Sequence, residues 1–534
     1  MAHDLTVDGL GLAQGLRLRS ALLRPECYPH AVSVVRMIET HISWVFLTGP
    51  WAYKVKKPVD LGFLDFTTLE ARRRCCEAEL RLNRRLASEI YDSVVEIRGT
   101  PDRPRIGGSG ALLDYAVKMR EFPQDALASE MLARGAFSRE HTDRLARGIA
   151  AFHGSAARAG ADSPFGTPDA VLAPALENFR ALETLAGDGF GREALGPLRQ
   201  WTMQQHCARR AAFDLRHAEG FVRECHGDLH LRNIVVLDGR PIPFDCIEFS
   251  EALRWIDVMS EIAFLAMDFE DRGRRDLAWR FLNGYLETTG DYPGAGVLRF
   301  YLVYRALVRA KVHALRVRQA GSDEAERVRL QCAAREYVAL ATRHASPAQP
   351  ALIITHGVSG SGKTTTTQAL IERIGAVRVR SDIERKRLCG LAPLARSGAG
   401  GDIYTKASTA ATYARLRSLA RSILEGGYTA VVDAAFLQRA QRDAFRALAA
   451  ELRVPFCVLA FDAPVGVLRE RVTQRFAAGA DASEADIRVL ERQLEYRETI
   501  GAGEERCTIR VDTEKPLARD AFESLVQRLS LRKV

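Results

Sequence analysis

The sequence has no apolar run of about 18 residues, the length that a helix needs to cross a bilayer, so we expect no membrane span. Its first residues, MAHDLTVDGLGLAQG, show no basic region followed by an apolar one, and we therefore expect no secretory signal. The ten cysteines are scattered and form no C-x-x-C pair. Scattered thiols are typical of reduced cysteines in a cytoplasm, and they predict no zinc site. We therefore expect a cytoplasmic protein.

Lysine is also scarce, because only 10 of the 76 basic residues are lysines and the other 66 are arginines. The net charge of +9 makes a polyanionic partner such as nucleic acid possible. In a chain this rich in alanine and glycine we attribute the arginine bias to genome composition, so nucleic acid is not the favoured partner. A lysine retained in such a chain indicates that a compact ammonium group is needed. Three lysines fall in YKVKKP (Lys54, Lys56 and Lys57), and another is Lys363.

The chain, at 534 residues, is too long for one ordinary core and predicts about two to four domains. The stretch HASPAQP, 344–350, is small, polar and proline-containing, and we place the main boundary there. Before it, strand-like segments precede helical ones, which predicts a two-lobed α+β domain over 1–345 with a small lobe ending near residue 120. After it, short apolar strands alternate with helices, which predicts an α/β domain with a parallel sheet over 350–534.

A phosphate-binding pattern follows the first strand of the second domain. The stretch GVSGSGKT, 357–364, satisfies G-x-x-x-x-G-K-[ST] between an apolar strand and a helix. Its glycines let backbone N–H groups curl round a phosphate, and the helix adds its positive end. In this pattern Lys363 reaches the β- and γ-phosphates and Thr364 holds Mg²⁺, while Asp433 at the end of a later strand is a second metal ligand. The expected nucleotide-binding residues are Gly357, Ser359, Gly360, Ser361, Gly362, Lys363, Thr364 and Thr365.

Charged residues beside this loop suggest what the second domain does. Asp382 follows the second strand, across from the phosphate loop, and its structural alternative is an N-cap of the next helix. Arginines follow the third and fourth strands at Arg439, Arg442, Arg469, Arg471 and Arg475. Over roughly 350–534 the chain resembles the small P-loop kinases related to polynucleotide kinase, gluconate kinase and zeta toxins. The resemblance implies that Asp382 deprotonates or orients an acceptor hydroxyl, and that lid arginines, for which we select Arg442 and Arg471, neutralise the transferring phosphoryl group.

The stretch HGDLHLRN, 226–233, brings an Asp, two His and an Asn together. His226 and His230 are spaced as in the zinc-binding H-E-x-x-H helix, but a loop replaces the helix and an Asp replaces the Glu, which disfavours zinc. The stretch also fits the kinase catalytic loop H-x-D-x-x-x-x-N, in which Asp228 accepts or orients the hydroxyl proton and Asn233 binds a metal ion. A polar hairpin is the structural alternative. Further on, the apolar strand PIPFDCIEF delivers Asp245, which suits a second Mg²⁺ ligand.

This loop, with His-Gly-Asp in place of the His-Arg-Asp of protein kinases, resembles the aminoglycoside phosphotransferase and choline kinase branch over roughly 30–340. The resemblance implies that AYKVKKP is the third strand of the small lobe, with Lys56 as the nucleotide-phosphate lysine and Lys54 as the alternative. It implies that Glu79 pairs with Lys56, with Glu77 as the alternative. The stretch LLDYAVKM resembles the hinge that receives adenine.

Two departures from the kinase pattern bear on substrate and nucleotide contacts. Asp245 is followed by Cys246 and Ile247, so Asp-Phe-Gly is absent, which is ordinary in this branch and argues against protein substrates. No clear G-x-G-x-x-G covers the phosphates in the small lobe. The stretch LRWIDVMSEIAFLAMD, with Asp257, does match the helix that usually follows the metal-binding Asp in this branch.

The whole chain resembles bacterial fusions of an aminoglycoside phosphotransferase-like domain with an ATP-binding domain. We therefore expect an ATP- and Mg²⁺-dependent phosphotransferase with two nucleotide sites, acting on hydroxyls of small molecules. One alternative is that the P-loop domain is a polynucleotide 5′-hydroxyl kinase, and another is that it is a regulatory nucleotide-binding module beside a single kinase. A fold does not fix a substrate, so the acceptor is not predicted.

Overall fold

The structure, a computed structural model, describes residues 11–62, 64–185, 192–319, 323–347, 349–393, 395, 405–478 and 482–513. Contacts divide the chain into two compact units. The first consists of Met1–Leu145, Ala151–Gly166 and His217–Glu261, and the second of Ala146–Ala150, Thr167–Arg216 and Ile262–Val534. Residues 167–216 and 262–345 therefore share one unit with the chain after 350, a division that differs from a boundary at 344–350.

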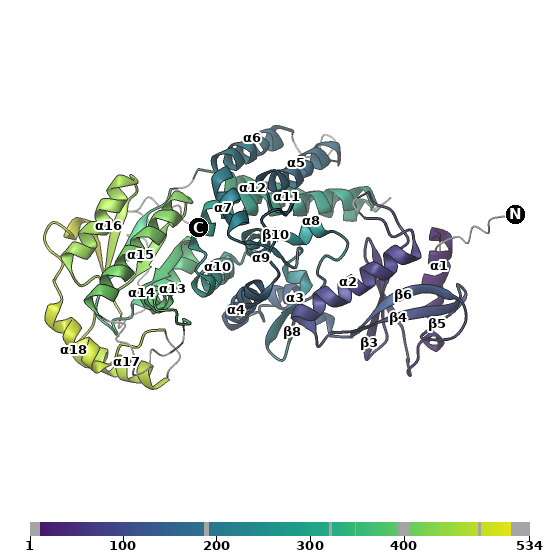
Figure 1. Cartoon of the computed structure of the whole chain (residues 1–534), viewed down its shortest axis with the longest axis horizontal. Helices are drawn as coiled ribbons and strands as arrows, with labels where there is room; N and C mark the ends of the chain where they lie inside the picture. The colour runs from purple at the N-terminus through teal and green to yellow at the C-terminus, as the bar shows by residue number, and fades with distance from the viewer. Residues whose placement is uncertain are drawn as a thin grey trace. The chain divides into compact units, whose positions relative to one another are not determined.

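An antiparallel sheet forms the core of the first unit (Figure 1). Its strands run in the order β1-β2-β3-β6-β4-β5 and all neighbours are antiparallel. They are β1 (Arg36–Glu39), β2 (Ser43–Leu47), β3 (Trp51–Lys56), β4 (Tyr91–Thr100), β5 (Arg103–Ile106) and β6 (Leu112–Arg120). Strand β3 is buried from Ala52 to Lys56. Its two lysines therefore need charged partners inside the protein.

Helix α2 (Leu69–Ala87) packs against β4 and β6 of this sheet, and α1 (Leu12–Ala21) precedes the first strand. The Thr68 side chain begins α2 by accepting a hydrogen bond from the N–H of Ala71 at 3.1 Å. Cys76, Glu79 and Leu82 recur at helical spacing and are all buried. Glu79 is therefore a carboxylate on the buried face of this helix.

Two short pairs of strands flank the HGDLHLRN stretch. Strand β7 (Val222–Glu224) precedes it and pairs antiparallel with β10 (Trp255–Asp257), which comes later in the chain. Strands β8 (Ile234–Leu237) and β9 (Arg240–Pro243) follow it directly and form a second antiparallel pair. The helices of this part are α3 (Ala128–Ala133), α4 (Arg139–Ser155), α7 (Arg210–Ala218), α8 (Glu251–Arg254) and α9 (Val258–Asp271), of which α4, α7 and α9 pass from one unit to the other. Single 3-10 turns are Pro25–Cys27, Gln124–Ala126 and Leu231–Asn233.

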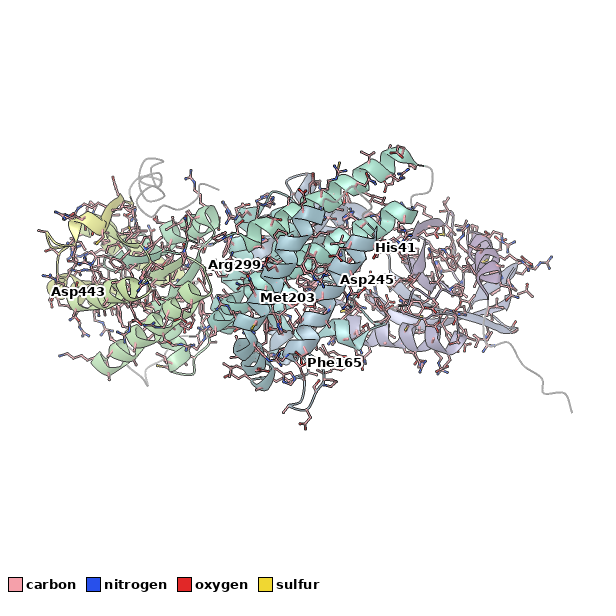
Figure 2. All side chains as sticks on the ribbon, turned by 90° about the horizontal axis from the view of Figure 1, so that it is seen from above. His41, Phe165, Met203, Asp245, Arg299 and Asp443 are labelled. Atoms are coloured by element: carbon pink, nitrogen blue, oxygen red, sulfur yellow. The ribbon has the colours of Figure 1, made fainter. Side chains whose placement is uncertain are left out.

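The second unit begins with long helices. They are α5 (Pro168–Leu185), α6 (Arg192–Ala208), α10 (Arg275–Thr289), α11 (Ala295–Gln319) and α12 (Glu324–Ala345), with a 3-10 turn at Tyr292–Gly294. Arg299 of α11, labelled in Figure 2, donates two hydrogen bonds, of 3.1 and 2.7 Å, to the carbonyl of His344 near the end of α12. Across the part of the chain that the structure describes, no helix combines the length and the apolar character that a membrane crossing needs.

The rest of the second unit is a parallel sheet with helices. Its strands, in the order β12-β13-β11-β14-β15, are paired in parallel throughout. They are β11 (Leu352–His356), β12 (Val377–Arg380), β13 (Ala430–Asp433), β14 (Phe456–Asp462) and β15 (Thr508–Asp512). The helices are α13 (Lys363–Ile374), α14 (Ser381–Leu388), α15 (Lys406–Glu425), α16 (Arg439–Glu451), α17 (Val465–Ala478) and α18 (Ile487–Tyr496), with a 3-10 turn at Glu505–Cys507. The predicted fold class is confirmed for both halves of the chain.

Strand β12 lies at the edge of the parallel sheet, and a side chain of helix α10 completes that edge. The Asn283 side chain donates to the carbonyl of Ala376 at 2.9 Å and accepts from the N–H of Arg378 at 2.7 Å. The amide thus makes the pair of hydrogen bonds that a neighbouring strand would make. Within the second unit, α10 packs against β12 and against α13, the helix that follows the phosphate-binding pattern (Figure 1).

Candidate functional site

In the first unit, two lysines of β3 share one glutamate of α2. Lys54 and Lys56 lie two residues apart, so their side chains project from the same face of the strand. Lys54 Nζ is 2.7 Å from Oε1 of Glu79, and Lys56 Nζ is 2.5 Å from its Oε2. The predicted pair of Lys56 and Glu79 is therefore present, but Lys54 makes an equivalent contact. Glu77, the alternative partner, pairs instead with Arg73 at 2.9 Å on the surface.

The second contact of each lysine tells the two apart. Lys54 Nζ lies 2.5 Å from Oδ1 of Asp245, whose side chain is 40% exposed. Lys56 is fully buried and its second partner is the carboxylate of Glu248. Lys56 is enclosed by two carboxylates, whereas Lys54 faces the partly exposed Asp245. This geometry favours Lys54, the alternative, as the phosphate lysine, and the choice between the two stays a prediction.

The electrostatics of this cluster agree with its geometry. Burial alone would raise the pKa of the Asp245 carboxyl, but the nearby Lys54 ammonium lowers it overall. Burial would also lower the pKa of Lys56, but Glu248 and Glu79 raise it overall. Glu248 is a residue that sequence reasoning missed. The signal was a second acidic residue in the stretch DCIEF, three positions after Asp245.

The catalytic-loop candidates Asp228 and Asn233 lie together. The Asn233 amide nitrogen donates to Oδ2 of Asp228 at 3.0 Å and to its backbone carbonyl at 3.1 Å. His226 Nε2 donates to the carbonyl of Phe244 at 2.8 Å, and its Nδ1 accepts from the N–H of Asp228 at 3.3 Å. Nε2 thus joins the loop to the residue before Asp245, Nδ1 makes a contact within the loop, and burial lowers the pKa of this imidazole. His230 Nε2 lies 3.4 Å from Oδ2 of Asp228.

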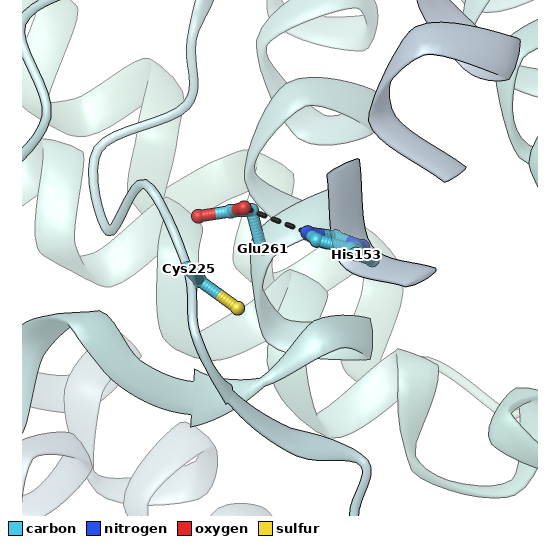
Figure 3. A group of neighbouring side chains, drawn as sticks. All are labelled: His153, Cys225 and Glu261. Atoms are coloured by element: carbon cyan, nitrogen blue, oxygen red, sulfur yellow. Dashed lines mark hydrogen bonds and ion pairs between the residues drawn. The ribbon is translucent and has the colours of Figure 1, made fainter. Parts of the chain in front are cut away.

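A buried group of three side chains lies under the same loop (Figure 3). Glu261 Oε2 is 2.8 Å from His153 Nε2, and Glu261 Oε1 accepts from the N–H of Gly227 at 2.7 Å. Cys225 Sγ is 3.5 Å from the carbonyl of Ile256. One ligand atom of each of His153, Cys225 and Glu261 falls within 4.8 Å of the others, which a metal ion would require. Since both Glu261 oxygens already accept hydrogen bonds, we interpret the group as a clamp on the catalytic loop.

Sequence reasoning missed this clamp and singled out Asp257, one helical turn before Glu261. Asp257 is buried and its Oδ1 accepts from the N–H of Met259 at 2.8 Å, a contact at the start of α9. An acidic residue inside the apolar helix EIAFLAMD was the available signal. A buried carboxylate at such a position needs partners, but only the fold identifies them.

The clamp makes a prediction about stability. Glu261→Ala is expected to lower the free energy of unfolding of this region by about 3–5 kcal/mol, because it removes the buried carboxylate that bonds to both the His153 imidazole and the N–H of Gly227. Urea unfolding followed by circular dichroism measures the loss. Cys225→Ala is the control and should cost clearly less, since a thiol is a weak hydrogen-bond donor and the distance from its sulfur to the Ile256 carbonyl is 3.5 Å. If a chelator destabilises the wild type as much as Glu261→Ala does, the group is a metal site and the clamp interpretation fails.

The phosphate-binding pattern of the second unit forms a cradle that only glycine permits at two positions. Gly357 has φ 154° and Gly360 has φ 82°. A Cβ at these glycines would lie 2.7 Å from the carbonyl oxygen of Phe461 and 2.8 Å from that of Leu468, respectively. Lys363 Nζ folds back over the loop and donates to the carbonyls of Gly357 at 2.9 Å and Val358 at 2.8 Å.

The remaining predicted residues of the loop lie around this cradle. Thr364 Oγ1 donates to Oδ2 of Asp433 at 2.8 Å, so the two predicted metal ligands are in contact. The N–H of Ser359 donates to Oε1 of Gln493 on α18 at 2.7 Å. Ser361 is buried and Thr365 is exposed. The strand before the loop and the helix after it are those that the sequence predicts.

Asp382 stands near the cradle. Burial lowers the pKa of Lys363 to about 8, against the opposing effects of Asp433 and Asp382, and Arg475 lowers it further. The carboxylate of Asp382 and the guanidinium of Arg475 are therefore close enough to act on the Lys363 ammonium. Helix α14 begins at Ser381 with Arg380 as its N-cap, so the alternative that Asp382 is the N-cap is wrong.

The lid arginines separate into different environments. Arg442 is fully buried and pairs with both oxygens of Glu504 at 2.7 and 3.0 Å, and it also donates to the carbonyl of Phe436. These contacts tie α16 to a distant part of the chain and disfavour Arg442 as a phosphoryl-binding arginine, a role that stays an untested prediction. The pair holds the pKa of the Glu504 carboxyl at about 2. Arg439 is an exposed residue 3.5 Å from Asp443, the acidic residue labelled in Figure 2.

Helix α17 carries the other three arginines. Arg471 donates to Oγ1 of Thr513 at 2.9 Å and to its carbonyl at 3.0 Å, and the Thr513 side chain lies against Gly362 of the loop. Arg471 is therefore held beside the cradle. Arg475, which we considered but did not select, acts electrostatically on Lys363 and also donates to the carbonyl of Ala485 at 3.3 Å. Arg469 pairs with Glu491 at the surface.

Comparison with known proteins gives matches for both halves of the chain. Residues 77–301 match the phosphotransferase enzyme family, and residues 352–500 match the AAA domain family. The uncharacterized protein Rv2004c of Mycobacterium tuberculosis (strain ATCC 25618 / H37Rv) is 31% identical over 462 residues, which cover 86% of this chain and 90% of that protein. The uncharacterized protein Mb2027c of Mycobacterium bovis gives the same figures.

Among solved structures, the chain is similar to the amicoumacin kinase hAmiN in complex with AMP-PNP, Ca²⁺ and Ami. The two are 12% identical, with 61% of this chain and 94% of that chain covered and a TM-score of 0.38. A gluconokinase from Sinorhizobium meliloti 1021 is 24% identical, with 34% and 94% covered and a TM-score of 0.26. The extent of the mycobacterial matches, together with the two family matches, confirms the expected fusion. The chain belongs to the same family as these mycobacterial proteins, and it joins a kinase-like phosphotransferase domain to a P-loop AAA domain.

Proposed function

We propose that the chain is an ATP- and Mg²⁺-dependent phosphotransferase with two nucleotide sites, each transferring a γ-phosphoryl group to a hydroxyl of a small molecule. The observation that supports it most is the cluster in the first unit, where Lys54 contacts Asp245 and Asn233 contacts Asp228. Asp228 also acts on the pKa of Asp245, so the two pairs are close enough to interact. A lysine, two carboxylates and an amide are the groups that phosphoryl transfer uses.

In the N-terminal site, each of these residues has a separate task. Lys54 neutralises the phosphates of ATP, and Glu79 holds the lysine in place. Asp228 accepts the proton of the acceptor hydroxyl while the hydroxyl oxygen bonds to the γ-phosphorus. The bond between the γ-phosphorus and the bridging oxygen breaks, and ADP leaves. Asn233 and Asp245 would hold Mg²⁺, which supplies charge neutralisation at the phosphates. Mg²⁺ prefers oxygen ligands such as theirs, and the Asp245 side chain is partly exposed to solvent.

In the P-loop site, the backbone of 357–362 cradles the phosphates and Lys363 neutralises them. Thr364 and Asp433 would hold Mg²⁺, since both present oxygen atoms and already touch. Asp382 remains as the carboxylate that orients the acceptor hydroxyl. Arg475 and Arg471, on the helix beside the loop, would stabilise the negative charge of the transferring group.

A transfer screen on the full-length chain tests the proposal. Radiolabelled γ-phosphate from ATP is offered to sugars, aminoglycosides, nucleosides and oligonucleotides, and the expected result is a labelled small-molecule product. The screen is repeated with Asp382→Asn, which should remove the part of the transfer that comes from the P-loop site. Labelling of an oligonucleotide 5′ end, with a steep salt dependence of binding, would instead support a polynucleotide kinase. Failure of the chain to transfer to any class or to consume ATP would refute the proposal.

The low pKa of Lys363 predicts a pH effect on nucleotide binding. Below about pH 8 the lysine is charged in both the free and the bound state. Above it the free lysine is neutral, while the bound phosphates favour its charged form. Binding should then take up as much as about one proton, and affinity should fall by at most about tenfold per pH unit.

Calorimetric titration with ATP in two buffers of different ionisation enthalpy measures this proton uptake. Lys363→Met is the reference, because the N-terminal site contributes equally to both proteins. The expected result is a proton uptake in the wild type that the variant lacks. Equal uptake in both proteins would show that Lys363 does not titrate in this range.

A further inference from the structure

A buried arginine connects helix α10 to the first turn of the P-loop helix. Arg378 on β12 is buried, and its Nε and one terminal nitrogen donate to Oε1 of Glu287 on α10 at 3.1 and 2.8 Å. Its other terminal nitrogen donates to the carbonyl of Thr364 at 3.0 Å and to Oγ1 of Thr367 at 3.2 Å. Arg378 also donates to the Gln368 side chain at 2.7 Å. One guanidinium therefore binds α10 and α13 together.

The same two threonines contact the predicted metal carboxylate. Thr364 Oγ1 donates to Oδ2 of Asp433 at 2.8 Å, and Thr367 Oγ1 lies 3.4 Å from the same atom. A continuous path of polar contacts thus runs from Glu287 through Arg378 and the threonines to Asp433. Outer partners of this kind orient metal ligands and tune the site, although they never touch the metal.

The position of Glu287 is unfavourable for its own helix. It lies in the last turn of α10, where the helix dipole disfavours a negative charge. Its stabilisation comes from Arg378 at 2.8 Å and, more weakly, from Arg380 at 3.8 Å. Arg378 lies next to the residues that are expected to hold Mg²⁺. Without Glu287, it would be a buried cation that has lost this carboxylate partner. An uncompensated positive charge there opposes the binding of a cation.

We propose that Glu287 and Arg378 are positioning residues of the P-loop site, so that a helix of the phosphotransferase domain is part of the nucleotide site of the AAA domain. Helix α10 falls inside the stretch that matches the phosphotransferase family, and the cradle falls inside the AAA match. The inference rests on the proposed nucleotide and Mg²⁺ binding by the P-loop. It adds that Mg²⁺ affinity in this site depends on a carboxylate from the other domain.

The test uses the full-length chain and a fluorescent ATP analogue, whose binding is titrated with and without Mg²⁺. Glu287→Gln keeps the shape of the side chain and removes its charge. We expect the Mg²⁺ concentration for half-maximal tightening of binding to rise by about 10-fold or more. Affinity in the absence of Mg²⁺ should change by less than about twofold, since Glu287 does not touch the cradle. Glu287→Asp, which keeps the charge on a shorter side chain, should give an intermediate shift.

Arg209→Gln is the matched control. Arg209 donates to the carbonyl of Glu425 at 2.9 Å, so it also joins the helical part of the second unit to the P-loop part, but it contacts none of the P-loop residues. It should leave both titrations unchanged. An equal shift in Arg209→Gln, or an unshifted Mg²⁺ titration in both Glu287 variants, would overturn the inference. The proposed function fails separately, if Lys363→Ala binds the analogue as tightly as the wild type.

Discussion

Asp228→Ala is expected to lower phosphoryl transfer by the N-terminal site by about 10²- to 10⁴-fold, the range in which a positioned general base contributes. The carboxylate is held by the Asn233 amide at 3.0 Å and lies on a loop that His226 and Glu261 fasten to the protein interior. Alanine removes the proposed proton acceptor and leaves Lys54 and Asp245 in place. ATP binding by this site should therefore be retained while transfer is lost.

Lys363→Ala is the reciprocal change. It removes the ammonium group from the cradle, and nucleotide binding by the P-loop site should be lost while transfer by the N-terminal site continues. Calorimetry should count two nucleotide sites in the wild type and in Asp228→Ala, and one in Lys363→Ala. Glu219→Ala, an exposed carboxylate in the same unit as Asp228, is the control and should behave as the wild type. Loss of both activities from either change, in a folded protein, would indicate one composite active site.

The two lysines of β3 should respond to the same substitution in different ways. Lys54→Met is expected to lower transfer by the N-terminal site by about 10²- to 10³-fold, as the removal of a preorganised charge partner usually does. Lys56→Met should act mainly on stability, by about 3–5 kcal/mol, because it leaves Glu79 and Glu248 buried without their shared cation. Urea unfolding and steady-state kinetics measured on both variants separate these effects.

A second substitution sharpens this comparison. Glu248→Gln, added to Lys56→Met, removes the buried carboxylate that has lost its partner and should restore most of the lost stability. Any transfer that Lys56→Met loses because the protein unfolds should recover together with the stability. If the double variant is stable but inactive while Lys54→Met remains active, Lys56 is the phosphate lysine after all.

The parts of the site that lie within one short stretch could be predicted from the sequence. The cradle depends on glycines whose backbone conformation is local, and both the strand before it and the helix after it stand where they were expected. Asp228 and Asn233 are likewise five residues apart in one loop, and the structure places them in contact. The prediction of their roles stays a prediction until the variants are measured.

Choices that depend on distant contacts could not be made from the sequence. Lys54 and Lys56 share one face of a strand, so the alternation of side chains cannot rank them, and only the contact with Asp245 does. Arg442 has the spacing of a lid arginine, yet its partner Glu504 lies 62 residues away, and no local sequence pattern predicts this pair. The N-cap alternative for Asp382 was wrong because the helix begins earlier, at Ser381. Sequence reasoning places a helix start only to within a few residues.

The amide of Asn283, which completes the edge of the parallel sheet, also bears on how the two domains could be separated. Strand β12 owes two of its edge hydrogen bonds to that side chain. A fragment that begins at residue 350 would present the N–H of Arg378 and the carbonyl of Ala376 at an open edge. Unpaired edges recruit further strands and promote aggregation. The chain is thus protected against self-association by a residue that belongs, by sequence, to its other domain.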